Sequence, residues 1–121
     1  MQKAWVVEVT PQVGDWWSSL AEDDQQRVRV GIQLLAARGP ALGHPYTSGI
    51  IGSRHGRMRE LRVQSGGRPL RILYALDPRR VAILLAAGDK TGDDRFYERM
   101  VPLADRLYDQ HLDQLKQEGS I

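Results

Sequence analysis

The 121-residue sequence contains no cysteine, and it has no apolar run long enough to cross a membrane. Without thiols the chain has neither a disulfide framework nor a thiolate zinc site, and a cysteine nucleophile is excluded. Residues 1–10 hold a short apolar stretch interrupted by Glu8, which is too short and too polar for a signal peptide. We therefore expect a cytoplasmic protein without membrane contact, folded as one domain over residues 1–121.

Metal-ligand spacing is also missing. The three histidines are scattered, with His44 and His55 in a glycine-rich stretch and His111 far along the chain. Neither they nor the pair Asp93-Asp94 match a recognised ligand pattern. We expect no metal ion and no cofactor, and we expect His111 to be structural.

Positive charge is present in excess in only one part of the chain. Residues 54–80 hold eight arginines and two acidic residues, whereas the whole chain has a formal net charge of +2. The planar guanidinium group can pair with phosphate oxygens through two hydrogen bonds and can stack on bases. The window favours a nucleic-acid backbone or an acidic protein as partner, with a solvated basic surface as the simpler alternative. Its arginines are Arg54, Arg57, Arg59, Arg62, Arg68, Arg71, Arg79 and Arg80.

Apolar periodicity predicts a strand and two helices in the first half. Residues 5–10 are β-branched and aromatic, as is typical of a strand. Apolar residues at helical spacing predict helices over 13–20 and 22–38. Trp16 and Trp17 either belong to the core or form a stacking platform for bases. Residues 39–56 should form a loop, with Ile50-Ile51 packed against the core.

The second half favours an antiparallel meander followed by a helix. The strand-length runs 57–64, 69–76 and 79–87 are separated by Gly66-Gly67 and Asp77-Pro78. The alternation of side chains along the middle run places Arg71 on an open face of the sheet rather than in a loop.

The last helix is expected to carry Phe96 and Tyr97 and to be capped by Asp93 or Asp94, with Pro102 beginning a new turn. The expected fold is α+β: a mostly antiparallel sheet of about four strands, two N-terminal helices and one C-terminal helix, with the helices on one face.

Several motifs occur in an order that resembles the RelE/ParE toxin superfamily, and most closely its HigB-like, phage-derived branch. The resemblance covers nearly the whole chain. It implies a RelE-like fold, pairing with a small antitoxin, and cleavage of messenger RNA, commonly on the ribosome. The motifs are Met58-Arg59-Glu60-Leu61-Arg62, Arg71-Ile72-Leu73-Tyr74-Ala75-Leu76-Asp77-Pro78, Ala87-Gly88-Asp89-Lys90-Thr91-Gly92, Tyr97, Pro102-Leu103-Ala104-Asp105, Tyr108 and His111-Leu112.

The resemblance also singles out candidate catalytic residues. Arg71 matches the arginine that RelE-like enzymes place on a central strand, and Arg62 on the preceding strand is a second candidate for holding phosphate. Lys90 follows the last strand, where related enzymes place catalytic groups, although it is otherwise typical of a surface turn. Tyr97 is the matching aromatic, able to donate a proton or stack on a base, unless it belongs to the core.

Other positions are assigned to RNA binding or to support of the arginines. HigB-like toxins carry histidines at the end of the last strand, where this chain has Asp89-Lys90. Glu60 is interpreted as an ion-pair partner that orients arginines rather than as a base. The candidate RNA-binding residues are Arg57, Arg59, Arg62 and Arg68.

The sequence therefore predicts the toxin of a type II toxin–antitoxin system that cuts messenger RNA without a metal and inhibits translation. Its partners would be messenger RNA, on the ribosome, and a small helix-turn-helix antitoxin. Two alternatives remain. A ParE-like toxin of the same fold would bind gyrase, and a regulatory module would bind RNA without cutting it.

Overall fold

The computed structural model describes residues 4–121 and contains one five-stranded sheet in the order β1-β5-β4-β3-β2. β1 pairs in parallel with β5, and the other neighbours are antiparallel. This arrangement confirms the α+β class and the antiparallel meander, but the expected number of about four strands was one too low. The strands are β1 (Val6–Val9), β2 (Thr47–Gly49), β3 (Arg59–Ser65), β4 (Arg68–Leu76) and β5 (Val81–Asp89).

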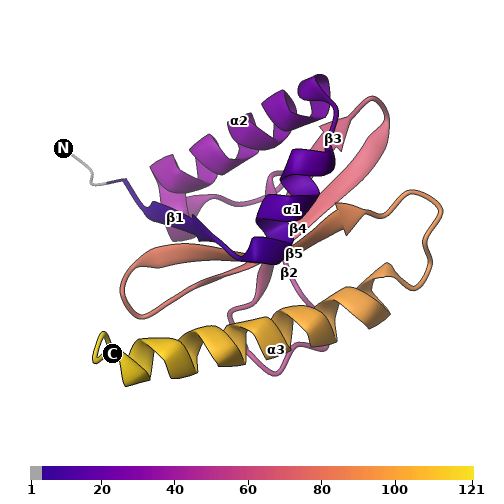
Figure 1. Cartoon of the computed structure of the whole chain (residues 1–121). Helices are drawn as coiled ribbons and strands as arrows, with labels where there is room; N and C mark the ends of the chain where they lie inside the picture. Colours follow the sequence, from indigo (N-terminus) through magenta and orange to yellow (C-terminus); the bar gives the residue numbers. More distant parts are fainter. Residues whose placement is uncertain (1–3) are drawn as a thin grey trace.

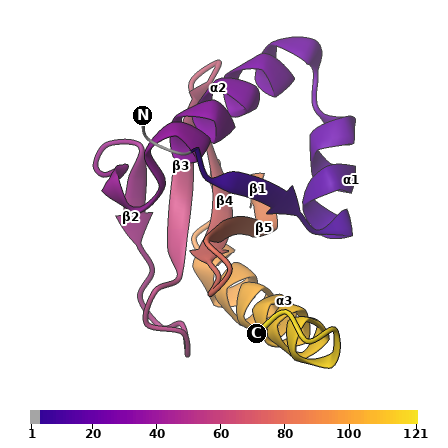
Figure 2. The same cartoon turned by 90° about the vertical axis from the view of Figure 1, so that its left-hand side faces the viewer.

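The helices cover both faces of the sheet, which corrects the expectation that they share one face. α1 (Pro11–Ser19) and α2 (Glu22–Arg38) pack on one side, and α3 (Phe96–Gln117) lies across the other (Figure 1). The view turned by 90° shows the same separation and places β2 at the sheet edge remote from α1 (Figure 2).

Two apolar clusters explain this layering. The alternation of side chains along β4 sends Leu70, Ile72 and Tyr74 into one cluster with Val28 and Leu35 of α2. It sends Leu73 and Ala75 of the same strand into a second cluster, which α3 covers. Because both faces of β4 are apolar, a helical layer on each side is required to keep them from water. Trp16 and Trp17 are partly buried and pack against the first cluster, which favours their assignment to the core.

The position of Pro102 and the N-cap of the last helix both differ from expectation. Pro102 lies inside α3 rather than at the start of a new turn, so one continuous helix spans Phe96–Gln117. Asp93 does not occupy the cap position, which belongs to Arg95, but its carboxylate accepts a hydrogen bond from the Arg95 backbone N–H at 3.1 Å. The β3–β4 turn is as predicted, because Gly66 and Gly67 both adopt positive φ, at 59° and 79°.

The expected loop at residues 39–56 contains the fifth strand. β2 is only three residues long and pairs with β3 at the sheet edge. Ile50, just beyond it, packs against the α3-side cluster, whereas Ile51 is 97% exposed. Half of the expectation for this isoleucine pair was therefore wrong.

Candidate catalytic site

Glu60 on β3 lies at the centre of a polar group on the α3 side of the sheet. The Tyr97 hydroxyl donates a hydrogen bond to Glu60 Oε1 at 2.6 Å, and the Ser48 hydroxyl donates to Oε2 at 2.7 Å. Arg71 Nε lies 3.5 Å from Oε1 as an ion-pair partner. Glu60 was expected to pair with Arg59 or Arg62 beside it on β3, whereas its ion-pair partner in the structure is Arg71 of β4. We call Glu60, Arg62, Arg71, Lys90 and Tyr97 the Glu60 cluster.

Strand register brings the arginines to this face. Arg62 of β3 pairs directly with Arg71 of β4, so the two side chains stand on the same side of the sheet. The next position across the sheet is Gly88 of β5, where a Cβ would come within 3.0 Å of the Phe96 ring. The absence of a side chain at Gly88 lets the start of α3, and with it Tyr97, approach the arginine row.

Lys90 is positioned by the turn that follows β5. Its backbone N–H donates to the Pro69 carbonyl at 3.0 Å, and Asp89 orders the turn by accepting hydrogen bonds from the Thr91 backbone and hydroxyl. These Thr91 hydrogen bonds lower the pKa of the Asp89 carboxyl. The Lys90 ammonium lies 5.1 Å from the centre of the Tyr97 ring, a cation–π contact. Lys90 and Tyr97 therefore belong to one site.

Burial and the neighbouring Glu60 carboxylate raise the pKa of Tyr97, and Arg71 opposes that effect only in part. The Tyr97 hydroxyl consequently keeps its proton at neutral pH and can donate it. The cluster as a whole sets three cationic side chains against one carboxylate. Such an excess of positive charge can bind an anion and can stabilise the additional negative charge that develops on it during a reaction.

Arg71 corrects an expectation about exposure. Its side chain is only 4% exposed, because α3 covers this part of the face that the strand pattern suggested was open. Nη1 donates to the Leu70 carbonyl at 2.9 Å, whereas Nε is buried without a hydrogen-bond partner among the described residues. Arg71 is therefore a buried charge behind the site, and Arg62, Lys90 and Tyr97 are the more accessible members.

The remaining predicted RNA-binding arginines do not join the Glu60 cluster. Arg59 donates to the Thr47 hydroxyl at 3.0 Å and pairs in register with Tyr74, which places it on the opposite face. Arg68 forms ion pairs with Asp24 at 2.5 Å and Asp89 at 3.4 Å. Arg57 is exposed in the loop before β3.

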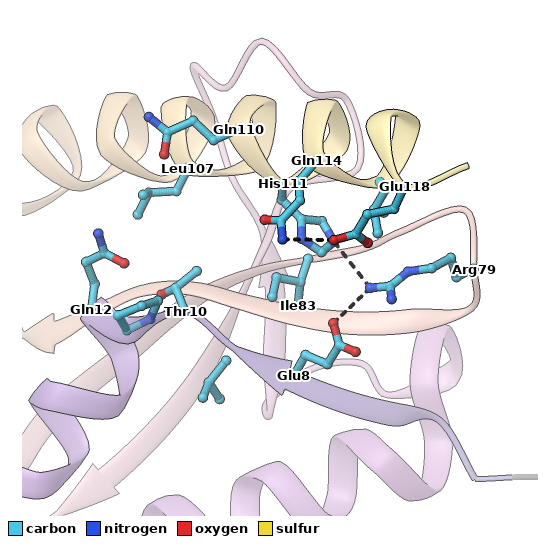
Figure 3. Close-up of a pocket in the computed structure, with 13 residues that line it drawn as sticks. Glu8, Thr10, Gln12, Arg79, Ile83, Leu107, Gln110, His111, Gln114 and Glu118 are labelled. Atoms are coloured by element: carbon cyan, nitrogen blue, oxygen red, sulfur yellow. Dashed lines mark hydrogen bonds and ion pairs between the residues drawn. The ribbon is translucent and has the colours of Figure 1, made fainter. Parts of the chain in front are cut away.

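A second polar group lies near the far end of α3. The Asp77 carboxylate, fully buried, accepts hydrogen bonds from Arg79 Nη2 at 2.7 Å and lies 2.8 Å from His111 Nε2. Arg79 continues to Glu8 at 2.8 Å (Figure 3). We call Asp77, Arg79, His111 and Glu8 the Asp77 cluster. It borders a cavity of about 670 Å³ between β1, the start of α1 and the second half of α3.

Sequence reasoning missed two parts of the site. Ser48 holds the second oxygen of Glu60, but it lies on a strand of three residues that carries almost no periodic signal. Gly49, Ile50 and Ile51 follow it and, together with Glu60 and Tyr97, line a cavity of about 260 Å³. In residues 4–121 no group of His, Asp and Glu side chains gathers as a metal ion would require.

The comparison with solved structures defines the class of fold. The chain superimposes on an arginine-to-alanine double mutant of the Escherichia coli toxin RelE in the free state, with a TM-score of 0.58. The match covers 80% of this chain and 95% of RelE at 11% sequence identity. The chain has the RelE-like fold, as expected.

Sequence comparison defines the family. Residues 15–109 match the model of the family described as phage-derived protein Gp49-like, and the chain belongs to this family. It is 40% identical to the candidate toxin HigB2 of Mycobacterium tuberculosis over 114 residues, which are 93% of this chain and 56% of HigB2. It is 42% identical to the candidate toxin HigB3 of the same organism over 83% of this chain and 87% of HigB3. The resemblance to HigB-like proteins is confirmed, and the chain spans little more than half the length of HigB2.

No helix in residues 4–121 combines the length and the apolar character needed to cross a bilayer.

Proposed function

We propose that this protein is the toxin of a type II toxin–antitoxin system and a metal-independent endoribonuclease that cuts messenger RNA on the ribosome. The observation that carries the proposal is the Glu60 cluster, in which Lys90 contacts the Tyr97 ring, the Tyr97 hydroxyl donates to Glu60, and Arg62 and Arg71 pair in register on the neighbouring strands. The family relatives HigB2 and HigB3, described as candidate toxins, support the same assignment. The expected site of action is the cytoplasm.

The chemistry needs no metal because RNA carries its own nucleophile. The 2′-oxygen attacks the adjacent phosphorus and loses its proton to a base, while the bond from phosphorus to the 5′-oxygen breaks and that oxygen gains a proton. The products are a 2′,3′-cyclic phosphate and a 5′-hydroxyl. The protein must move two protons and stabilise the extra negative charge on the phosphorane.

The roles follow from exposure and charge. Arg62 and the Lys90 ammonium are accessible enough to contact the phosphate, and Arg71 adds positive charge from behind it. We assign the Tyr97 hydroxyl as the proton donor for the 5′-oxygen because it stays protonated at neutral pH and lies in one site with Lys90. Glu60 is a positioning residue that holds Tyr97 and Arg71 in place.

An antitoxin is the implied protein partner. A basic face that binds RNA has to be neutralised when the toxin is idle, and an acidic and apolar segment that folds on binding would do so. We propose that a gene beside this one encodes a small DNA-binding protein with such a segment. Co-expression of the two products should give a stable complex, and the absence of a complex with either neighbouring product contradicts this assignment.

One experiment separates the proposed nuclease from its alternatives. The purified protein is incubated with ribosomes translating a defined messenger RNA, with the same RNA free in solution, and with DNA gyrase. A nuclease produces new 5′ ends in the RNA, with ribosomes or without them. Intact RNA together with inhibited gyrase supports the ParE-like alternative, and binding of RNA without cutting supports a regulatory module.

A further inference from the structure

Gly49, Ile50 and Ile51, which we call the 49–51 shelf, border the Glu60 cluster with an apolar surface. Ile51 is 97% exposed, the highest value among the large apolar side chains described as exposed. A single exposed isoleucine is ordinary on a protein surface. This one, however, lines the same cavity as Glu60 and Tyr97, so its exposure falls at the entrance to the proposed catalytic site.

The shelf is held in place by contacts to α3. Just after it, the Ser53 hydroxyl and the Arg54 backbone N–H both donate to the buried Asp105 carboxylate, at 2.5 and 3.0 Å. The His55 ring lies 2.8 Å from Asp109 and edge-on against Tyr108. The backbone N–H of Ile50 also donates to the carbonyl of Met58 at 3.3 Å, which closes the loop at its base. Ile51 is thus presented to solvent by an anchored segment.

The size and lining of the cavity select the kind of ligand. Its volume of about 260 Å³ lies below the roughly 300–1,000 Å³ of pockets for drug-sized ligands, so one flat ring system suits it better than a peptide segment. Two isoleucines and a tyrosine ring supply apolar surface against which such a ring can pack. Glu60 is the charged residue of the cavity lining, and two cations lie next to the lining residues: Lys90 is 5.1 Å from the centre of the Tyr97 ring and Arg71 is 3.5 Å from Glu60, so a phosphate attached to the ring system would be bound on their side.

We infer that the 49–51 shelf and Tyr97 receive one base of the RNA strand next to the phosphate that is cut. This inference rests on the proposed nuclease function and names the part of the substrate that the cavity recognises. Packing of the base on an anchored apolar surface fixes the sugar and phosphate relative to Lys90 and Arg62. The shelf accordingly influences where along the RNA the protein cuts.

The test compares Ile51→Ser with Val6→Ser, which changes a 59% exposed valine on β1, at the sheet edge opposite β2, as a matched control. Binding of a fluorescent single-stranded RNA is measured in a Lys90→Ala background, and cut sites on one messenger RNA are mapped by sequencing of 5′ ends. Ile51→Ser should weaken binding roughly 5- to 20-fold, as expected for loss of packing against a base, and should redistribute the cut sites. Val6→Ser should change neither, and Ile51→Leu should leave both as in the unmodified protein.

The two levels of proposal fail differently. If the protein cuts RNA and Ile51→Ser binds and cuts as the unmodified protein does, the shelf does not receive a base and the inference is overturned. If the unmodified protein never produces cut ends, the proposed nuclease is wrong, whereas the binding comparison still shows whether the shelf contacts RNA.

Discussion

The Glu60 and Asp77 clusters both hold a buried carboxylate beside α3, but they differ in how completely the neighbouring arginine is hydrogen-bonded. The Asp77 carboxylate accepts hydrogen bonds from the backbone N–H, Nε and Nη2 of Arg79. His111 Nε2 also lies within hydrogen-bond distance of it. At Glu60 the nearest cation is Arg71, whose Nε is buried without any hydrogen-bond partner in the described part of the chain. A satisfied group favours stability, whereas an incompletely satisfied one is typical of functional sites.

The two clusters also differ in net charge, and the Glu60 cluster is the more positive. The Asp77 cluster has two carboxylates and one arginine, with His111 able to add a second positive charge. The Glu60 cluster has three cations and one carboxylate. Tyr97 and His111 lie on the same helix, 14 residues apart, or about 21 Å at 1.5 Å per residue. The first turn of α3 therefore lies at a cation-rich cluster, which suits a phosphate. Its second half lies at a cluster whose charged groups are paired with one another.

Arg71→Ala should have the largest effect because it damages both function and folding. Removal of the guanidinium leaves Glu60 buried without its ion-pair partner, a loss of about 3 kcal/mol in the free energy of unfolding. Loss of its charge should also lower the cleavage rate about 100- to 1000-fold. Urea unfolding and RNA cleavage are measured on the same preparation, with the exposed Arg80→Ala as the arginine control.

A double variant separates the two losses in Arg71. Glu60→Gln with Arg71→Met removes both charges, so stability should return toward that of the unmodified protein while cleavage stays lost. Recovery of cleavage in this variant would show that Arg71 has only a structural role.

Asp77→Ala should have a comparable effect on stability and no direct effect on the chemistry. It leaves Arg79 and His111 without their buried partner, at a cost of about 3–5 kcal/mol in the free energy of unfolding. The fraction of protein that remains folded should cut RNA at the normal rate. A loss of cleavage per folded molecule, measured by circular dichroism and end mapping together, would mean that the Asp77 cluster belongs to the catalytic site.

The pH dependence of this effect has a definite sign. Burial alone would raise the pKa of Asp77, but the hydrogen bonds from Arg79 and His111 outweigh it and lower the pKa. The stabilisation by Asp77 is therefore complete above the pKa of an unfolded aspartate, about 3.9, and is lost as the pH falls further. The difference in urea midpoint between the unmodified protein and Asp77→Asn should accordingly shrink below pH 4.

Strand alternation and turn residues predicted most of this fold correctly. Gly66-Gly67 identified the β3–β4 hairpin, and the alternation along β4 correctly assigned Arg71 and Ile72 to opposite faces. Exposure could not be predicted in this way, because it depends on α3, which returns from the end of the chain to cover one face. The three-residue β2 was missed because so short a strand has no period of its own.

The sequence predicted only part of the candidate site, for the same reason. Arg71, Lys90 and Tyr97 were named from the sequence and lie around Glu60, and Arg62 shares their face of the sheet by strand register, whereas Arg59 and Arg68 lie elsewhere. Arginines next to one another in sequence alternate between faces of a strand, so their count in a window does not reveal how many share a site. The contact of Ser48 with Glu60 depends on tertiary pairing that no local pattern reports.

Lys90→Ala should abolish function without the cost in stability that Arg71→Ala incurs. The side chain is only partly buried and contacts Tyr97 through its ring, so the free energy of unfolding should change little. Cleavage should fall about 100- to 1000-fold, and growth inhibition should disappear. Lys116→Ala, at an exposed position in the last turn of α3, is the lysine control. Undiminished toxicity of Lys90→Ala at equal expression would place the catalytic centre elsewhere.

Tyr97→Phe should have the smallest effect. It keeps the ring that contacts Lys90 but removes the hydroxyl that donates to Glu60, so it deletes one proton donor and leaves the cations in place. We expect a fall in cleavage rate of roughly 100-fold, at the low end of the range for general acid–base catalysis. An unchanged rate and pH profile would show that Tyr97 is a structural member of the cluster.

In the proposed reaction RNA acts as its own nucleophile, and the chemical ends of the cut RNA test this most directly. A free RNA, or messenger RNA recovered from ribosomes, is cut by the purified protein, and its ends are identified by mass spectrometry. The reaction with free RNA is also run in the presence of millimolar EDTA. We expect 2′,3′-cyclic phosphate or 3′-phosphate ends together with 5′-hydroxyl ends, unchanged by the chelator and absent when Lys90→Ala is used. Cut RNA with 3′-hydroxyl and 5′-phosphate ends, or cleavage abolished by EDTA on the free substrate, would contradict the proposed reaction.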